Sequence, residues 1–166
     1  MCGKIVSMFA TKKELGQHWL HDDESLQAMA DGIELKKTDT VLEIGPGLGT
    51  LTAKLTDQAK KVIAVEFDTD LARELVGRVP TANLQIVRQD ILQFDLTTLP
   101  KKYKIAANIP YYLTSNLLRV LCESANPFSR AAILVQKEVA ERVAAEPGDM
   151  SLLSVSVQYY CDVGLG

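Results

Sequence analysis

Short apolar runs alternate with longer amphipathic stretches along most of this chain. Such runs are typical of strands buried on both faces, and the amphipathic stretches are typical of helices that connect parallel strands. The expected strands cover residues 41–44, 62–66, 84–88, 103–107 and 131–135. The expected helices cover residues 22 or 23 to about 33, 50–59, 69–79, 114–123 and 137–145, while residues 152–160 form a helix or a long strand. The sequence therefore predicts an α/β protein with a mostly parallel, Rossmann-like sheet and helices on both faces.

Length and composition fit one globular domain over residues 1–166. Apolar residues make up 47% of the chain and charged residues 23%, proportions that are typical of globular proteins. No apolar run is long enough to cross a bilayer, and the run at residues 5–10 is too short for the core of a signal peptide. We therefore expect a cytoplasmic protein with no membrane partner. Residues 163–166 look like the start of another element, so we expect the last strand or strands of the sheet to be missing.

The numbers of cysteines and histidines and the net charge bear on three properties: disulfides, metal sites and nucleic-acid binding. Three cysteines without Cys-x-x-Cys spacing and only two histidines indicate neither a disulfide framework nor a metal site. The net charge of −3 is unusual for a protein that binds a polyanion, because Lys and Arg contacts to phosphate dominate nucleic-acid affinity. Lysines do gather near the start of the chain and at Lys101, Lys102 and Lys104. Such runs are usually solvated faces, and the first one is of further interest because it precedes Gly16-Gln17.

Asn108-Ile109-Pro110-Tyr111 follows the expected strand at 103–107, and Tyr112 adds a second aromatic ring. Ligands bind at the carboxyl ends of strands in open α/β sheets. The Asn108 amide oxygen can accept a hydrogen bond from an NH₂ group, Pro110 stiffens the backbone, and the ring of Tyr111 offers a face for stacking. The tetrad is therefore suited to holding the exocyclic amine of a flipped-out base.

A glycine-rich turn, Gly45-Pro46-Gly47-Leu48-Gly49, joins the first expected strand to its helix. Glycines allow close backbone approach, and the helix N-terminus beyond supplies amide donors. A dinucleotide-binding fingerprint would require a third glycine where this chain has Thr50. Pyrophosphate also gains nothing from the carboxylate of Glu43 just before the turn, whereas a cationic ligand does. S-Adenosylmethionine, with its sulfonium and α-ammonium groups, fits this turn.

Two more acids end the next two expected strands. Glu66 is placed to accept hydrogen bonds from both hydroxyls of a ribose, and the carboxylate of Asp90 can accept one from the amino group of adenine. An acid at the position of Glu66 also occurs in NAD sites, so Glu66 alone does not discriminate between the two cofactors. Three acids at successive strand ends favour a binding site over three separate helix caps.

With these motifs the chain resembles the ribosomal RNA adenine dimethyltransferase family of the KsgA type, and it is similar to the erythromycin-resistance rRNA methylases. The resemblance covers nearly the whole chain from about Lys12. It rests on residues 15–20, 43–50, 66–68, 89–90, 108–112, 136–139, 153–155 and 158–160.

The resemblance implies a Rossmann-like class I methyltransferase fold and a role for several residues. His18 and Leu20 belong to a segment that closes over the cofactor, although the family usually has asparagine at position 18. Gly45 and Gly47 would pack against the methionine part of S-adenosylmethionine. Asn108, Pro110 and Tyr111 would hold the adenine whose N6 receives the methyl group, and Asn108 would also contact the cofactor.

The resemblance also implies partners and leaves alternatives open. The expected substrate is ribosomal RNA of the 16S type in an immature small ribosomal subunit, dimethylated by a monomer without a metal ion. In the family a proline-rich stretch, a last strand and a small helical RNA-binding domain follow, and none of these is found here. The alternatives are an rRNA methylase of the large subunit, a non-catalytic nucleic-acid or ribosome-assembly protein of the same fold, and an NAD-dependent oxidoreductase.

Overall fold

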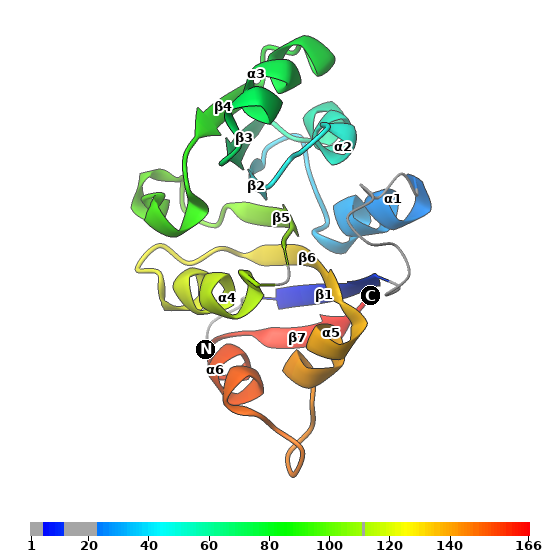
Figure 1. Ribbon diagram of the computed structural model, residues 1–166, viewed down its shortest axis with the longest axis vertical. Helices are drawn as coiled ribbons and strands as arrows, with labels where there is room; N and C mark the ends of the chain where they lie inside the picture. Colours follow the sequence, from blue (N-terminus) through cyan, green and yellow to red (C-terminus); the bar gives the residue numbers. More distant parts are fainter. Residues whose placement is uncertain (1–4, 12–22, 111) are drawn as a thin grey trace.

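A parallel β-sheet organises the protein (Figure 1). The structure is a computed structural model that describes residues 5–11, 23–110 and 112–166. Within these residues the strands are β1 (Ile5–Thr11), β2 (Thr40–Ile44), β3 (Lys61–Glu66), β4 (Leu84–Arg88), β5 (Lys104–Asn108), β6 (Arg130–Gln136) and β7 (Asp162–Leu165). They pair in the order β4-β3-β2-β5-β6-β1-β7, and every pair is parallel.

Helices cover both faces of this sheet. They are α1 (Asp23–Gly32), α2 (Thr50–Gln58), α3 (Thr69–Arg78), α4 (Thr114–Glu123), α5 (Lys137–Val143) and α6 (Leu152–Tyr160), with short 3₁₀ turns η1 (Ile91–Gln93) and η2 (Leu96–Thr98). Alternate residues of a strand point to opposite faces, so Leu42 packs with α4 and α6 while Val41 packs with α1 and α2. The predicted α/β class and the helices on both faces are confirmed.

The predicted elements agree with the structure to within about two residues at most ends, and residues 84–88 agree at both ends. Residues 152–160, which the sequence leaves open between helix and strand, form α6. The Ser151 hydroxyl accepts a hydrogen bond from the amide of Ser154 at 3.3 Å, and this cap satisfies a backbone donor that a helix start leaves unpaired.

Two strands were not among the five predicted ones. β1 lies between β6 and β7, and β7 contains residues 163–165 of the segment that the sequence predicts to start another element. The partners of β1 are Arg130–Gln136, more than a hundred residues away in the sequence. No local pattern reveals a pairing at that separation. That strands of the family's sheet lie beyond Gly166 stays a prediction.

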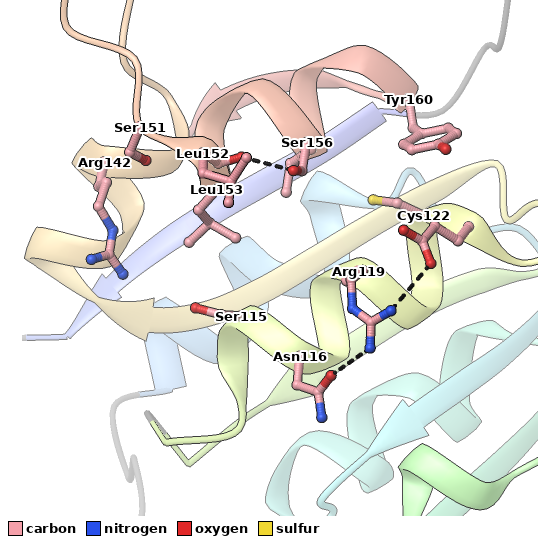
Figure 2. Close-up of a pocket in the computed structure, with 12 residues that line it drawn as sticks. Ser115, Asn116, Arg119, Cys122, Arg142, Ser151, Leu152, Leu153, Ser156 and Tyr160 are labelled. Atoms are coloured by element: carbon pink, nitrogen blue, oxygen red, sulfur yellow. Dashed lines mark hydrogen bonds and ion pairs between the residues drawn. The ribbon is translucent and has the colours of Figure 1, made fainter.

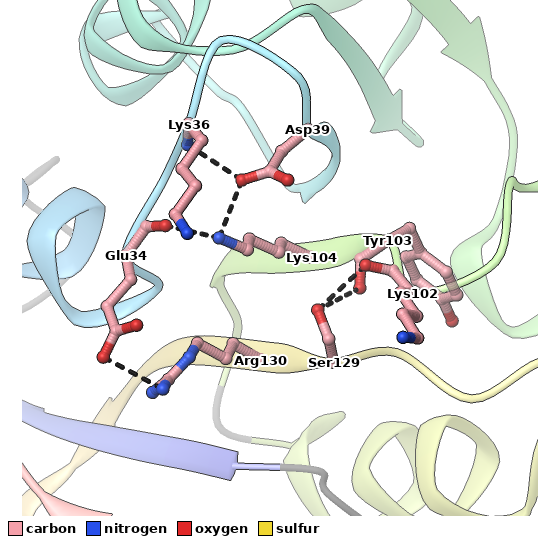
Figure 3. A network of polar contacts seen from close by, with 8 residues as sticks. All are labelled: Glu34, Lys36, Asp39, Lys102, Tyr103, Lys104, Ser129 and Arg130. Atoms are coloured by element: carbon pink, nitrogen blue, oxygen red, sulfur yellow. Dashed lines mark hydrogen bonds and ion pairs between the residues drawn. The ribbon is translucent and has the colours of Figure 1, made fainter.

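Lys104 is buried, so its interpretation as part of a solvated lysine run is wrong (Figure 3). The side chain is 9% exposed, and its ammonium lies 2.7 Å from the Asp39 carboxylate. The ammonium also donates to the carbonyl oxygen of Glu34. A buried charge is stable only when it is paired in this way. Lys101 and Lys102 are exposed as expected.

We expect Lys104→Ala to lower the free energy of unfolding by about 2–3 kcal/mol, because it removes the ammonium that pairs with the half-buried Asp39 carboxylate and donates to the Glu34 carbonyl, and leaves Asp39 with only the Lys36 amide as a donor. Lys101→Ala is the matched control, since Lys101 is exposed, and it should change the value by less than about 0.5 kcal/mol. Urea denaturation measures both. Equal effects of the two substitutions would show that the Lys104 contacts do not stabilise the fold.

Candidate functional site

The strand order reverses between β2 and β5, and this reversal creates the candidate site. From β2 the chain proceeds outward through β3 to β4, then returns to place β5 on the other side of β2. In sheets of this kind ligands bind where the strand order reverses, at the carboxyl ends of the strands. Ile44 pairs with Ala107, so the residues that follow, Gly45 and Asn108, face each other across this point.

Gly45 approaches the backbone of Asn108 so closely that no side chain fits at this position. Its φ angle is +67°, and a Cβ atom there would lie 2.9 Å from the Asn108 carbonyl oxygen. The Gly45 amide donates to the Val65 carbonyl at 3.1 Å, which ties the turn to β3 as well. Glycine is therefore required here by both conformation and space.

Glu66 holds the turn after β2 in place. Its Oε2 accepts a hydrogen bond from the Gly47 amide at 3.2 Å, and its Oε1 accepts one from the Asp68 amide at 2.9 Å. The side chain is buried. A carboxylate oxygen accepts about two hydrogen bonds, so each oxygen keeps capacity for a ligand hydroxyl. The residue serves the local structure and remains suited to the predicted ribose contact.

Glu43 is the most perturbed acid among the described residues. It is 1% exposed, and neither carboxylate oxygen has a hydrogen-bond partner in the described part of the chain. Burial raises the pKa of Glu43 from 4.5 to about 8; the neighbouring Thr52 hydroxyl lowers it, and the Glu66 charge raises it. Thr52 Oγ1 itself lacks a formed hydrogen bond, so the two groups are close without being well aligned. Such a carboxyl is a strong candidate for binding a cation.

A hollow of about 20 Å³ opens beside this carboxyl, and its lining includes Glu43, Gly45 and Asn108. That volume accommodates one water molecule or a group of similar size, such as an ammonium. Only one end of a cofactor would lie in it. The residues fit the cationic methionine end of S-adenosylmethionine, because a buried acid without a hydrogen-bond partner among the described residues lines the space and can ionise beside a cation.

The structure also describes Asp90 and, after β5, Pro110 and Tyr112 of the predicted site. Asp90 caps η1, with Oδ1 accepting from the Leu92 amide at 3.0 Å, so the cap interpretation and the binding interpretation both apply to this residue. The Pro110 carbonyl accepts from the Leu113 amide at 3.0 Å. Tyr112 is 82% exposed, which leaves its ring available for stacking.

Three predicted site residues, His18, Leu20 and Tyr111, lie outside the described residues. The structure brings Glu43, Gly45 and Asn108 together around one hollow and joins Gly47 to Glu66. Sequence reasoning missed Thr52, whose hydroxyl lies buried beside Glu43. Its place in the first turn of α2 could have suggested this contact. No group of three or more metal-ligating side chains occurs among the residues that the structure describes.

A larger cavity, about 570 Å³ in volume, lies elsewhere (Figure 2). Its lining comes from α4, the end of α5 and α6, and includes Arg119, Arg142 and Tyr160. None of the predicted site residues lines it. Size therefore does not identify the site, and the perturbed carboxyl at the strand reversal is the better guide.

Comparison with known proteins decides the family. The model of the family described as ribosomal RNA adenine dimethylase matches residues 8–165. The chain belongs to the ribosomal RNA adenine dimethylase family. The resemblance inferred from the sequence motifs is thereby confirmed.

Alignments with individual relatives give the sequence identity and the share of each protein's length that is matched. It is 41% identical to the ribosomal RNA small subunit methyltransferase A of Streptococcus equi subsp. zooepidemicus over 92% of the chain, and 42% identical to the protein of the same name from Clostridium botulinum over 93%. These alignments cover 56% and 58% of the relatives. The chain thus spans little more than half the length of these curated relatives.

Solved structures agree with the family assignment. A dimethyladenosine transferase from Plasmodium falciparum superposes with a TM-score of 0.76 at 34% identity, over 85% of this chain and 52% of that one. The 23S rRNA methyltransferase ErmE superposes with a TM-score of 0.71 at 30% identity, over 82% and 55%. In the described residues no helix is long and apolar enough to cross a membrane.

The raised pKa of Glu43 predicts a pH dependence of stability. The folded state holds the proton up to about pH 8 and the unfolded state only to about 4.5, so this group's contribution is lost as pH rises between these values. Glu43→Gln removes that loss. The free energy of unfolding of the variant relative to the parent should therefore increase by several kcal/mol, on the order of 3, across this range.

Chemical denaturation at a series of pH values measures this difference. Glu146→Gln is the matched control, because Glu146 is exposed, and its difference from the parent should stay nearly constant. A constant difference for Glu43→Gln as well would contradict the buried, protonated carboxyl.

Gly45→Ala should lower the free energy of unfolding by about 2–4 kcal/mol, since the new Cβ meets the Asn108 carbonyl at a positive φ angle. Gly77→Ala is the control: it lies within α3, and a Cβ there meets nothing within 4 Å. That substitution should stabilise the protein by up to about 1 kcal/mol. The opposite order of the two variants in urea denaturation would refute the close approach.

Proposed function

We propose that this chain binds S-adenosylmethionine and is the catalytic domain of an enzyme that methylates N6 of adenine in ribosomal RNA. The observation that carries the proposal is that Glu43 and Asn108 line the same hollow where the strand order reverses. An acid suited to a cation and an amide suited to an exocyclic amine are thereby adjacent. Membership of the dimethylase family supports this use of the two groups.

The cofactor would be held by residues of three strand ends. Glu43 would hold the cationic methionine end beside the close turn at Gly45 and Gly47. Glu66 keeps acceptor capacity for the ribose, and Asp90 offers its second carboxylate oxygen to the adenine amino group. The family resemblance adds His18 and Leu20 as residues that close over the cofactor.

When bound, S-adenosylmethionine supplies a methyl group on a positively charged sulfur. The task of the protein is to present a nitrogen that is a poor nucleophile, because its lone pair is delocalised into the adenine ring. Hydrogen bonds from N6 to the Asn108 side-chain oxygen and to the Pro110 carbonyl draw that nitrogen toward a tetrahedral geometry. Tyr111 stacks on the base once it has left its helix or loop. Positioning and electrostatics then supply most of the acceleration.

The proposed substrate is 16S-type RNA of the immature small ribosomal subunit, dimethylated in the cytoplasm by a monomer. The curated relatives named small subunit methyltransferase A support this choice. A large-subunit RNA is the second candidate, because the 23S rRNA methyltransferase ErmE superposes on 82% of this chain.

One experiment separates these functions. The chain is first titrated with S-adenosylmethionine and, separately, with NAD; binding of NAD alone would refute the proposal. Radiolabelled methyl transfer is then measured on undermethylated small subunits and on large-subunit RNA. Labelling of the small subunit supports the proposed substrate, and labelling of the large-subunit RNA supports the second candidate. Cofactor binding without labelling of either RNA would favour a non-catalytic binding protein.

Asn108→Ala should reduce methyl transfer at least about 100-fold, the usual cost of removing one positioned hydrogen-bonding group, with nearly unchanged cofactor affinity.

Asp90→Ala should instead weaken the affinity for the cofactor, which calorimetry measures. Asn116→Ala is the control, since Asn116 is exposed on α4 and should leave both properties intact. Unchanged turnover of Asn108→Ala would remove this residue from the mechanism, and unchanged affinity of Asp90→Ala would remove that one from the pocket.

A further inference from the structure

Two cysteines that are distant in the sequence contact each other on the face of the sheet that α4 and α6 cover. Cys122 lies in the last turn of α4, and Cys161 ends α6 just before β7. Their sulfur atoms are 3.6 Å apart, and both side chains are at least 96% buried. They are not joined by a disulfide. The sequence alone predicts no such pair, because the two residues share no motif.

The geometry brings these sulfurs within reach of a bond. A disulfide requires an S–S distance of about 2.05 Å, so the two atoms need to approach each other by about 1.5 Å. Small side-chain rotations supply movements of that size. The two residues belong to helices packed on the same face of the sheet, which fixes them side by side in the folded chain.

One of the two thiols borders an open space. Cys122 lines the cavity of about 570 Å³ between α4 and α6, and Cys161 does not. Figure 2 shows the Cys122 side chain pointing from α4 toward α6. A small neutral oxidant that enters this cavity can contact the Cys122 sulfur, and the Cys161 sulfur lies 3.6 Å from that atom without lining the cavity.

We propose that Cys122 and Cys161 are a redox-modification site, at which hydrogen peroxide oxidises the two thiols to an intramolecular disulfide. The Cys122 sulfur, on losing its proton, attacks one oxygen of the peroxide and breaks the O–O bond, which yields a sulfenic acid and a hydroxide that takes up the thiol proton to become water. The Cys161 sulfur then attacks the sulfenic sulfur, the S–S bond forms and a second water leaves. Two electrons pass from the sulfurs to the peroxide, and both thiol protons end in water. A dithiol reductant reverses the change by thiol–disulfide exchange.

The disulfide would tie the end of α4 to the start of β7. The closed loop contains β6, α5 and α6, so the bond would limit the opening of this whole part of the fold. Disulfides in reducing compartments are mostly transient and regulatory, and a buried pair that forms only under oxidation fits that class. The modification involves neither the cofactor nor RNA, so its test is independent of the proposed function.

The test uses the complete chain with the substitution Cys2→Ser, which leaves only the two thiols of the pair. The folded protein is treated with hydrogen peroxide, quenched with acid, unfolded and alkylated. Intact-mass measurement should show both thiols lost together, with a decrease in mass of two hydrogen atoms. Proteolysis should release one linked peptide that contains Cys122 and Cys161, and dithiothreitol should restore both thiols.

Variants of each cysteine define the order of the steps. In the Cys2→Ser background, Cys161→Ser should trap a dimedone-reactive sulfenic acid at Cys122 and form no intramolecular link. Cys122→Ser should leave Cys161 reduced at the same peroxide dose. The proposal is overturned if the linked peptide does not form in the Cys2→Ser protein under conditions that fully oxidise glutathione. It is also overturned if the lost thiols appear only as intermolecular disulfides or higher oxides.

Discussion

The approach of the turn after β2 to the end of β5 is the constraint on which the rest of the site depends. Gly45 lies so close to the Asn108 carbonyl oxygen that a Cβ atom would be 2.9 Å from it. This contact closes the crevice where the strand order reverses, and it brings the acid before the turn next to the amide after β5. A side chain at position 45 would push the two segments apart. Glu43 and Asn108 would then no longer share one hollow.

Much of this arrangement is predictable from the sequence, because strands buried on both faces appear as continuous apolar runs and end where polar residues begin. The acids Glu43, Glu66 and Asp90 could be placed at strand ends for that reason, and the family assignment agrees with the fold they imply. β1 could not be predicted in the same way. Its partner strand β6 begins at Arg130, and a pairing across that separation depends on the assembled sheet, which no local pattern encodes.

Burial and side-chain pairing are the other properties that the sequence leaves undetermined. Lys104 belongs to a lysine run yet is buried, because the start of β5 faces Asp39 and the Glu34 carbonyl from the segment before β2. Cys122 and Cys161 meet because α4 and α6 pack on one face. Asp90 both caps a 3₁₀ turn and remains a candidate ligand for adenine. In each case the deciding partner comes from another part of the chain.

The state of Glu43 connects folding to the proposed chemistry. A carboxyl with a pKa of about 8 and no hydrogen-bond partner among the described residues is kept neutral by the fold near pH 7. A cation in the adjacent hollow reverses this preference, because its attraction for the carboxylate offsets the cost of burying the charge. Binding at neutral pH must then release a proton, and the affinity for a cationic ligand rises with pH until the carboxyl is fully ionised. A neutral ligand would leave the carboxyl protonated and gain at most a hydrogen bond from it, so this buried acid favours a cationic ligand over a neutral one.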